Sequence, residues 1–153
     1  MHQEVTPGLI KGFRHTGIVV SNLERSLEFY GALLGFSVAK RMEESGAHLD
    51  AVLGLKDARL TTVKMSSPDG ALIELLHYQS HPRDRGSEHE SCRVGISHIA
   101  LTVKDLDQTY QRLKDWGIEF NAPPQRSPDG GVKLTFCRDP DGMLLELVEV
   151  LRE

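Results

Sequence analysis

The sequence has only two cysteines in its 153 residues, Cys92 and Cys137, and they do not form a C-x-x-C pair. So few cysteines exclude the dense disulfide framework of small secreted domains. We therefore expect both thiols to stay reduced. The first residues also lack an apolar stretch long enough for a signal peptide. Both features predict a cytoplasmic protein.

Long apolar runs and basic clusters are also missing. No stretch of the sequence approaches the roughly 18 apolar residues that a membrane-spanning helix needs. The 18 basic and 22 acidic residues are interspersed, and the net charge is −4. A nucleic-acid-binding surface would require a basic stripe or cluster. We therefore expect neither a membrane nor a nucleic acid as a partner.

The sequence does contain an internal repeat. The segment HTGIVVSNLERSLEFYGALLGF, from His15, aligns with HIALTVKDLDQTYQRLKDWGIEF, from His98. Farther along each half, PDGALIELLHY aligns with PDGMLLELVEV and places Glu74 over Glu146. A third Pro-Asp-Gly, at residues 128–130, precedes a segment without a glutamate, so we interpret it as a plain turn. The first strand of each half thus carries a histidine, and the last strand, which we call the closing strand, carries a glutamate.

The repeat predicts an α+β fold of two pseudo-symmetric βαβββ modules within one domain, residues 1–153. The modules span about residues 11–79 and 94–152, and a polar linker spans about residues 80–93. Capping residues at Ser21 and Asp105, followed by apolar residues at helical spacing, predict one helix in each module. We expect strands at residues 13–20, 36–40, 59–66 and 72–78, then at 97–103, 118–120, 133–137 and 144–150.

The glutamates in the apolar closing strands need an explanation, because an unpaired buried carboxylate costs several kcal/mol. A single strand histidine or glutamate is more often structural than a metal ligand. Here, however, the four positions recur as two matched pairs. If each sheet curls, the pairs meet on the concave face, because strand side chains alternate between faces. Imidazoles and carboxylates bind Zn, Ni, Co, Mn or Fe ions. We therefore predict one divalent transition metal held by His15, Glu74, His98 and Glu146.

These segments resemble the glyoxalase / bleomycin resistance / extradiol dioxygenase family, also called the vicinal oxygen chelate superfamily. The matching pieces are FRHTGIVVSNLERSLEFYGALLGF, LIELLHY, ISHIALTVKDL and FCRDPDGMLLELVEV, which together cover nearly the whole chain. The resemblance implies paired βαβββ modules that form a curved mixed sheet around a metal site. It carries the metal ligands over to the same four residues that the repeat identifies.

The ligand set is most similar to that of glyoxalase I, or lactoylglutathione lyase. Ring-cleaving dioxygenases use a His, His, Glu triad on iron, and antibiotic-binding relatives usually lack the metal residues. Methylmalonyl-CoA epimerase typically has Gln where this chain has Glu74. The extended middle of the first half, SGAHLDAVLGLKDARLTTV, is however more similar to uncharacterised or epimerase-like relatives. The epimerase, the dioxygenase and a non-catalytic small-molecule binder therefore stay open as alternatives.

The resemblance implies a reaction that chelates vicinal substrate oxygens and shifts a proton through an enediolate. Glu146 is the expected catalytic base and Glu74 its assistant. Glutathione or a CoA thioester would form part of the substrate. Arg126 and Lys133 flank a turn before the Glu146 strand and are candidates for binding an anionic substrate group, although solvated surface charges are the simpler interpretation. Small family members commonly form homodimers, and the cup is completed within one chain or between two.

Overall fold

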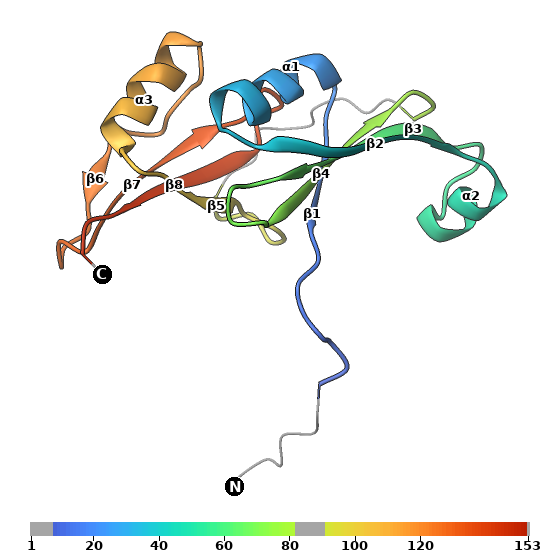
Figure 1. Ribbon diagram of the computed structural model, residues 1–153, viewed down its shortest axis with the longest axis horizontal. Helices are drawn as coiled ribbons and strands as arrows, with labels where there is room; N and C mark the ends of the chain where they lie inside the picture. Colours follow the sequence, from blue (N-terminus) through green and yellow to red (C-terminus); the bar gives the residue numbers. More distant parts are fainter. Residues whose placement is uncertain (1–7, 82–90, 153) are drawn as a thin grey trace, which may run out of the picture.

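The computed structural model describes residues 8–81 and 91–152 and shows two modules side by side (Figure 1). The first module contains β1 (Thr16–Val19), α1 (Leu23–Leu27) and a π-helical turn, η1 (Glu28–Leu33). It continues with β2 (Ser37–Ser45), α2 (Ala47–Leu53), β3 (Arg59–Ser66) and β4 (Leu72–Tyr78). Its four strands form one mixed sheet in the order β1-β4-β3-β2, in which β1 and β4 are parallel.

The second module repeats this topology. It contains β5 (Ile99–Thr102), α3 (Leu106–Asp115), β6 (Gln125–Arg126), β7 (Val132–Arg138) and β8 (Leu144–Val150). Its sheet has the order β5-β8-β7-β6, and β5 and β8 are again parallel. The α+β class and the two modules are confirmed, with one four-stranded sheet in each module. The central part of the expected linker, residues 82–90, lies outside the described residues.

Several local predictions need correction. Asn22, not Ser21, caps α1 by accepting a hydrogen bond from the Arg25 N–H, and Ser21 instead donates to Asp141 in the second module. The strand expected at residues 118–120 is reduced to a single bridge between Phe120 and Cys137. Regular pairing resumes only at β6, because the two prolines at residues 123–124 cannot donate ladder hydrogen bonds. Helix α2 was not anticipated.

Helices cover one face of each sheet, and the opposite face carries partly exposed side chains such as Glu74 and Glu146. In Figure 1, α1 and α3 lie above the strands of both modules. Buried residues of β4, such as Ile73 and Leu75, alternate with half-exposed ones, such as Glu74. In β1, Ile18 is buried and Val19 is 56% exposed. We call the side that carries Glu74, and the corresponding side that carries Glu146, the open face of each module.

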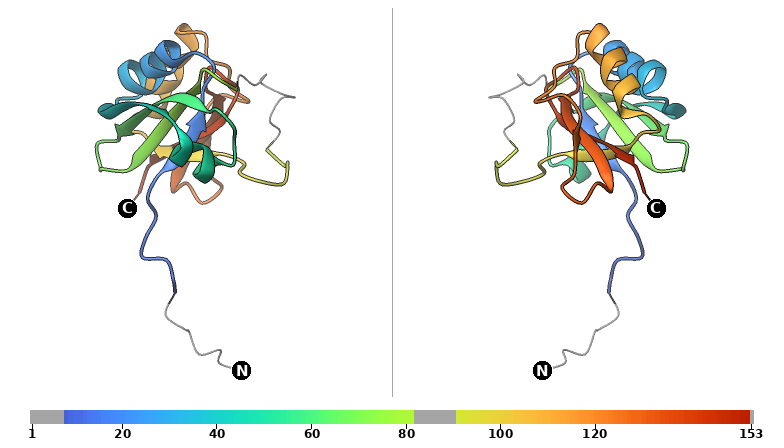
Figure 2. Two further views of the ribbon diagram at one scale, coloured as in Figure 1. Left: turned by 90° about the vertical axis from the view of Figure 1, so that its right-hand side faces the viewer. Right: turned by 90° about the vertical axis from the view of Figure 1, so that its left-hand side faces the viewer.

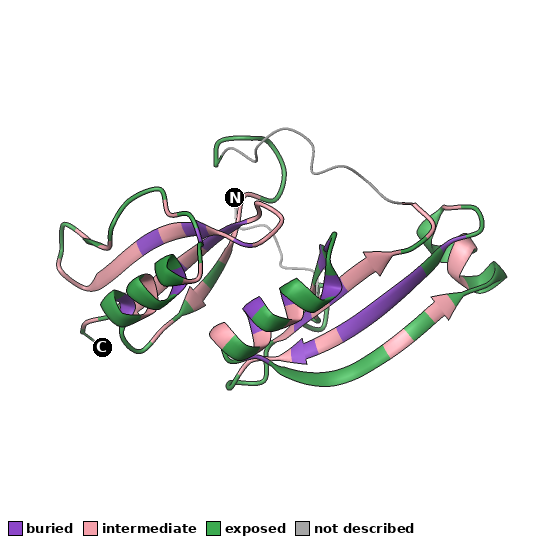
Figure 3. Cartoon of the chain, turned by 90° about the horizontal axis from the view of Figure 1, so that it is seen from above, coloured by how far each residue is buried: buried purple, intermediate pink, exposed green. Residues whose placement is uncertain are grey.

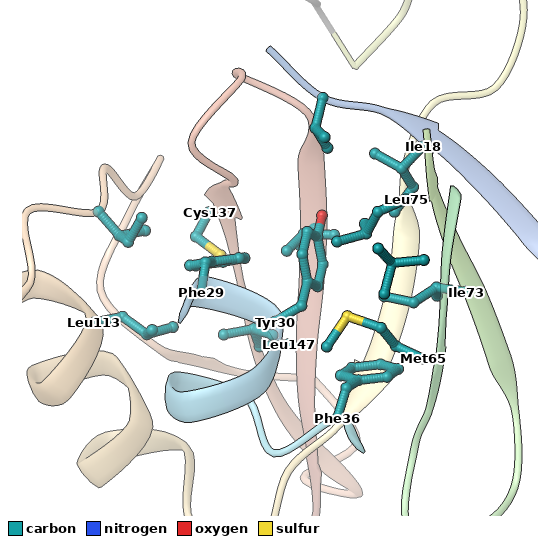
Figure 4. Packing of buried hydrophobic residues seen from close by; sticks show 14 of the residues in the cluster. Ile18, Phe29, Tyr30, Phe36, Met65, Ile73, Leu75, Leu113, Cys137 and Leu147 are labelled. Carbon is teal, nitrogen blue, oxygen red and sulfur yellow. The ribbon is translucent and has the colours of Figure 1, made fainter. Parts of the chain in front are cut away.

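The helix-covered sides of the two modules share a single hydrophobic core. Figure 4 shows Phe29 and Tyr30 of the first module among Leu113, Cys137 and Leu147 of the second. In the view from above, buried residues mark the central strands and one side of the helices in both modules (Figure 3). Within the described residues, no helix has the length and apolar character needed to cross a bilayer.

A buried hydrogen bond also connects the modules. The Tyr30 hydroxyl donates to an Asp139 carboxylate oxygen at 2.8 Å, and the two residues are 1% and 3% exposed. Burial raises the pKa of Asp139 above its ordinary value, although hydrogen bonds from the Met143 backbone N–H and from Tyr30 lower it. The two modules are therefore fixed against each other by polar as well as apolar contacts.

Candidate metal centre

The first candidate half-site combines His15, just before β1, with Glu74 in β4. Because β1 and β4 are parallel neighbours with Thr16 beside Ile73, the histidine is brought next to the start of the closing strand, whose third residue is Glu74. The His15 Nε2 atom lies 3.7 Å from a carboxylate oxygen of Glu74. The side chains are 30% and 16% exposed, so the pair is partly shielded from water and still accessible. We call these two residues half-site 1.

The second half-site repeats this arrangement with His98 and Glu146, and we call it half-site 2. The His98 Nε2 atom lies 3.1 Å from a Glu146 carboxylate oxygen, and the side chains are 33% and 23% exposed. The other ring nitrogen of His98 lies 3.0 Å from the Ser97 hydroxyl, which helps to orient the ring. Phe136 contacts the His98 ring edge-to-face at a centroid distance of 5.0 Å.

The donor atoms in each pair are spaced as neighbouring ligands of one metal ion would be. Metal–nitrogen and metal–oxygen bonds of about 2.0–2.2 Å place adjacent ligand atoms about 2.8–3.1 Å apart in octahedral geometry and about 3.3–3.6 Å apart in tetrahedral geometry. The pair in half-site 2, at 3.1 Å, fits the octahedral range, and the pair in half-site 1, at 3.7 Å, lies just above the tetrahedral range. One imidazole and one carboxylate are also a chemically suitable donor set for the predicted metals. Each half-site therefore fits half of a metal centre.

A single chain does not gather the four predicted ligands into one cluster. Within residues 8–81 and 91–152, no group of three or more His, Cys, Asp or Glu side chains is arranged to hold a metal ion. The two half-sites belong to different modules, and these modules are locked together through their helix-covered sides. Each predicted pair therefore forms, but within the described residues the two pairs do not join into one cluster in a single chain. The sequence left open whether the centre is completed within one chain or between two.

The two basic residues considered for substrate binding lie elsewhere. Lys133 forms ion pairs with Asp107 at 2.6 Å and with Glu149 at 3.3 Å, beside α3. Lys133 and Phe136 are three residues apart in strand β7, so their side chains leave the sheet on opposite faces. Phe136 is in register with Glu146 and shares its face, so Lys133 is on the other side of the sheet from Glu146. Arg126 is in register with Lys133 and so shares its face. This geometry assigns Lys133 to structural ion pairs and leaves both residues out of the candidate site.

The register also reveals neighbours of the half-sites that the sequence repeat did not indicate. Lys64 in β3 stands directly opposite Glu74, and Phe136 in β7 stands directly opposite Glu146. The alternation of Lys64 with buried Val63 and Met65 is a signal that could have placed it on the open face.

A cavity of about 500 Å³ lies between β1 and the turn that precedes β8. Its lining includes Gly17, Arg25, Ser97, Arg138 and Met143 but none of the four predicted ligands. Figure 2 shows the molecule from its two ends, and residues 8–14 extend away from the body. We therefore base the candidate site on the two half-sites and not on this cavity.

Comparison with known proteins gives a consistent family match. The family described as "Glyoxalase/Bleomycin resistance protein/Dioxygenase superfamily" matches residues 12–147. An uncharacterized protein of Bacillus subtilis, YwkD, is 33% identical over 92% of this chain and 98% of its own length. A lactoylglutathione lyase of Pseudomonas aeruginosa is 28% identical over 90% of this chain and 81% of its own length.

Solved structures agree with this match. A glyoxalase family protein of Bacillus cereus superposes with a TM-score of 0.83 at 24% identity, over 97% of this chain and 99% of the other. At that identity the likeness establishes the fold alone. A glyoxalase family protein of Enterococcus faecalis gives a TM-score of 0.65 at 27% identity, over 93% and 100% of the two chains.

Proposed function

Because this chain belongs to the Glyoxalase/Bleomycin resistance protein/Dioxygenase superfamily, we propose that it is a metal-dependent lyase or isomerase similar to lactoylglutathione lyase. The proposal is carried by one observation: two His–Glu pairs occupy matching positions in two repeated modules, with donor atoms 3.7 and 3.1 Å apart. The relatives named lactoylglutathione lyase support the choice of reaction.

In the proposed site, His15, Glu74, His98 and Glu146 hold the metal ion. A divalent transition metal, when bound there, supplies Lewis-acid polarisation of two neighbouring substrate oxygens. Glu146 removes the proton from the carbon beside the substrate carbonyl and returns it to the next carbon, as a general base and then a general acid. Its 23% exposure keeps this carboxylate accessible to substrate while excluding much of the surrounding water. Glu74 assists as the second carboxylate.

We further propose that the complete centre forms between two copies of the chain. Half-site 1 of one copy would then meet half-site 2 of a second copy. The shared core and the buried Tyr30–Asp139 hydrogen bond support this arrangement, because bringing the half-sites together within one chain would require both to be broken. A two-fold symmetric dimer of this kind contains two equivalent sites.

Activity and metal content test the reaction. The metal-reconstituted protein should convert the hemithioacetal of methylglyoxal and glutathione, and elemental analysis should find one metal ion per chain. Methylmalonyl-CoA serves as a parallel substrate: turnover of this compound alone would replace the lyase assignment by an epimerase. Protein that carries no transition metal after anaerobic purification would instead indicate a non-catalytic binder.

Mixed dimers test the assembly. His15→Ala and His98→Ala each remove one ligand from both sites of a homodimer, so each variant alone should be inactive. When the two variants are co-expressed, mixed dimers contain one site with both mutations and one intact site. Random pairing then restores about one-quarter of the wild-type sites. If each site were built within one chain, co-expression would restore no activity.

A further inference from the structure

The open face of the first module carries a lysine beside half-site 1. Lys64 is directly opposite Glu74 in the antiparallel β3–β4 pair, so their Cβ atoms are about 5 Å apart on the same face. Lys64 is half-buried. Glu74 nevertheless approaches His15, and no ion pair joins Glu74 to Lys64. Lys64 is therefore a neighbour of a candidate metal ligand on the same face, but its ammonium group lies more than 4.0 Å from the Glu74 carboxylate.

A second lysine continues this row of charge. Lys40 in β2 is directly opposite Lys64, on the same face. Within the described part of the chain, no carboxylate lies within 4.0 Å of either ammonium group. Glu44, the next acidic residue on this face of β2, is engaged at 2.5 Å by the Thr62 hydroxyl. Like charges directly opposite each other destabilise a sheet, so this pair is electrostatically unfavourable in the free chain.

Metal binding at Glu74 would add further positive charge beside the lysines. The local positive charge would then come from a divalent cation and two ammonium groups. The Glu74 carboxylate, which could offset this charge, would already be a metal ligand. An anionic group bound beside the metal ion relieves this repulsion, because opposite charges a few ångströms apart on a half-buried surface attract more strongly than in bulk water.

The corresponding position in the second module has no charge. The residue opposite Glu146 is Phe136, which packs against the His98 ring. The repeat thus preserves the ligand pairs but places a cation beside one and an aromatic ring beside the other. If the lysine only balanced the charge of a strand carboxylate, Glu146 would need the same partner, and it has none.

We propose that Lys64, with Lys40 behind it, binds a carboxylate group of the substrate next to half-site 1. This inference rests on the proposed function, because it assigns Lys64 a role in substrate specificity at that metal centre. The carboxylate can belong to the reacting part of the substrate, beside the chelating oxygens, or to a peptide tail such as that of glutathione. Both sources present the same chemistry to the ammonium groups.

A matched pair of small ligands tests the first source. Tartronate and lactate offer the same vicinal hydroxyl and carboxylate oxygens, but tartronate has a second carboxylate where lactate has a methyl group. Calorimetric titration of the full-length zinc-loaded protein should show tartronate binding about 10-fold more tightly than lactate, the size expected for one charged hydrogen bond. Lys64→Met should abolish this preference, and Lys64→Arg should restore most of it.

S-methylglutathione tests the second source. Its affinity should fall about 10-fold in the Lys40→Met/Lys64→Met double variant if the lysines bind the peptide carboxylates. The control is Lys114→Met, which removes the same charge from α3 on the helix-covered side and should change neither measurement. Circular dichroism and thermal melts of all variants confirm that the fold is retained.

The outcomes separate this inference from the proposed function. Zinc bound at one ion per chain, with tartronate preference and S-methylglutathione affinity both unaffected by the lysine variants, overturns the role of Lys64 and leaves the metal centre standing. Absence of zinc binding overturns the proposed function and the inference with it. Lysine dependence in either titration supports the inference and identifies the source of the carboxylate.

Discussion

Replacing Tyr30 by Phe tests whether the two modules are held together by the buried hydrogen bond to Asp139. The substitution keeps the aromatic ring in the core and removes only the hydroxyl that donates at 2.8 Å. One Asp139 oxygen then loses this donor, while the other keeps the backbone N–H groups of Asp141 and Met143. Hydrogen bonds to charged groups contribute about 1.5–3 kcal/mol, so the free energy of unfolding should fall by about 2 kcal/mol.

The effect of Tyr30→Phe should depend on pH. Because burial raises the pKa of Asp139 in the folded state, protonation of this carboxyl favours folding at acidic pH. That contribution is lost as the pH rises through the folded-state pKa. The Tyr30 hydrogen bond lowers this pKa, so its removal raises the pKa further and the variant gains more stability on acidification. The stability difference between wild type and variant should therefore be largest at neutral pH and narrow as the pH falls through the folded-state pKa of Asp139.

Urea denaturation followed by circular dichroism measures both effects, at one fixed protein concentration because dimerisation would shift the transition. A loss of about 2 kcal/mol corresponds to a melting temperature lower by about 4–8 °C for a chain of this size. Tyr110→Phe is the matched control, because its hydroxyl makes no hydrogen bond within the described residues. A loss below about 0.5 kcal/mol, or one that is independent of pH, would refute the assigned role of the hydrogen bond.

Three further predictions concern the site and the core. Glu146→Gln should retain part of the metal and lower kcat at least about 100-fold, because an amide is not a general base; steady-state kinetics with metal analysis checks this, and unchanged turnover contradicts the role. Cys137, whose pKa is raised to about 12 first by burial and then by Asp139, should resist iodoacetamide at pH 8 until urea is added, as peptide mass spectrometry would show. Lys133→Met should leave KM within about two-fold of wild type, since its ammonium pairs with residues near α3; a large rise in KM would return Lys133 to the substrate site.

Much of each module could be read from the sequence because its structure is locally encoded. The Pro-Asp-Gly turns and the alternation of apolar residues predicted the bounds of β3, β4 and β8 correctly. The same alternation placed Glu74 on the face of β4 opposite to its buried neighbours Ile73 and Leu75. Its pairing with His15 then follows from the parallel arrangement of β1 and β4. The cap at Asp105 was also correct, since its side chain accepts from the Gln108 N–H.

Other features depended on contacts between distant segments. Ser21 and Asn22 are equally suitable caps by composition, and the choice follows from the Asp141 carboxylate of the other module, which engages Ser21. The face of Lys133 and its position relative to Glu146 could not be assigned without the register of β7 with β8. A shift of one residue would exchange the two faces of a strand, and sequence spacing alone does not fix that register.

The sequence by itself determined two copies of one module, each with an imidazole and a carboxylate on neighbouring strands, because turn chemistry and strand alternation act within a few residues. Only the tertiary structure decided how the copies pack. Burial of Phe29 and Tyr30 against the second module unites the helix-covered sides in one core and separates the two half-sites within the chain. Such packing depends on surfaces far apart in the sequence, whose complementarity exists only after both modules have folded.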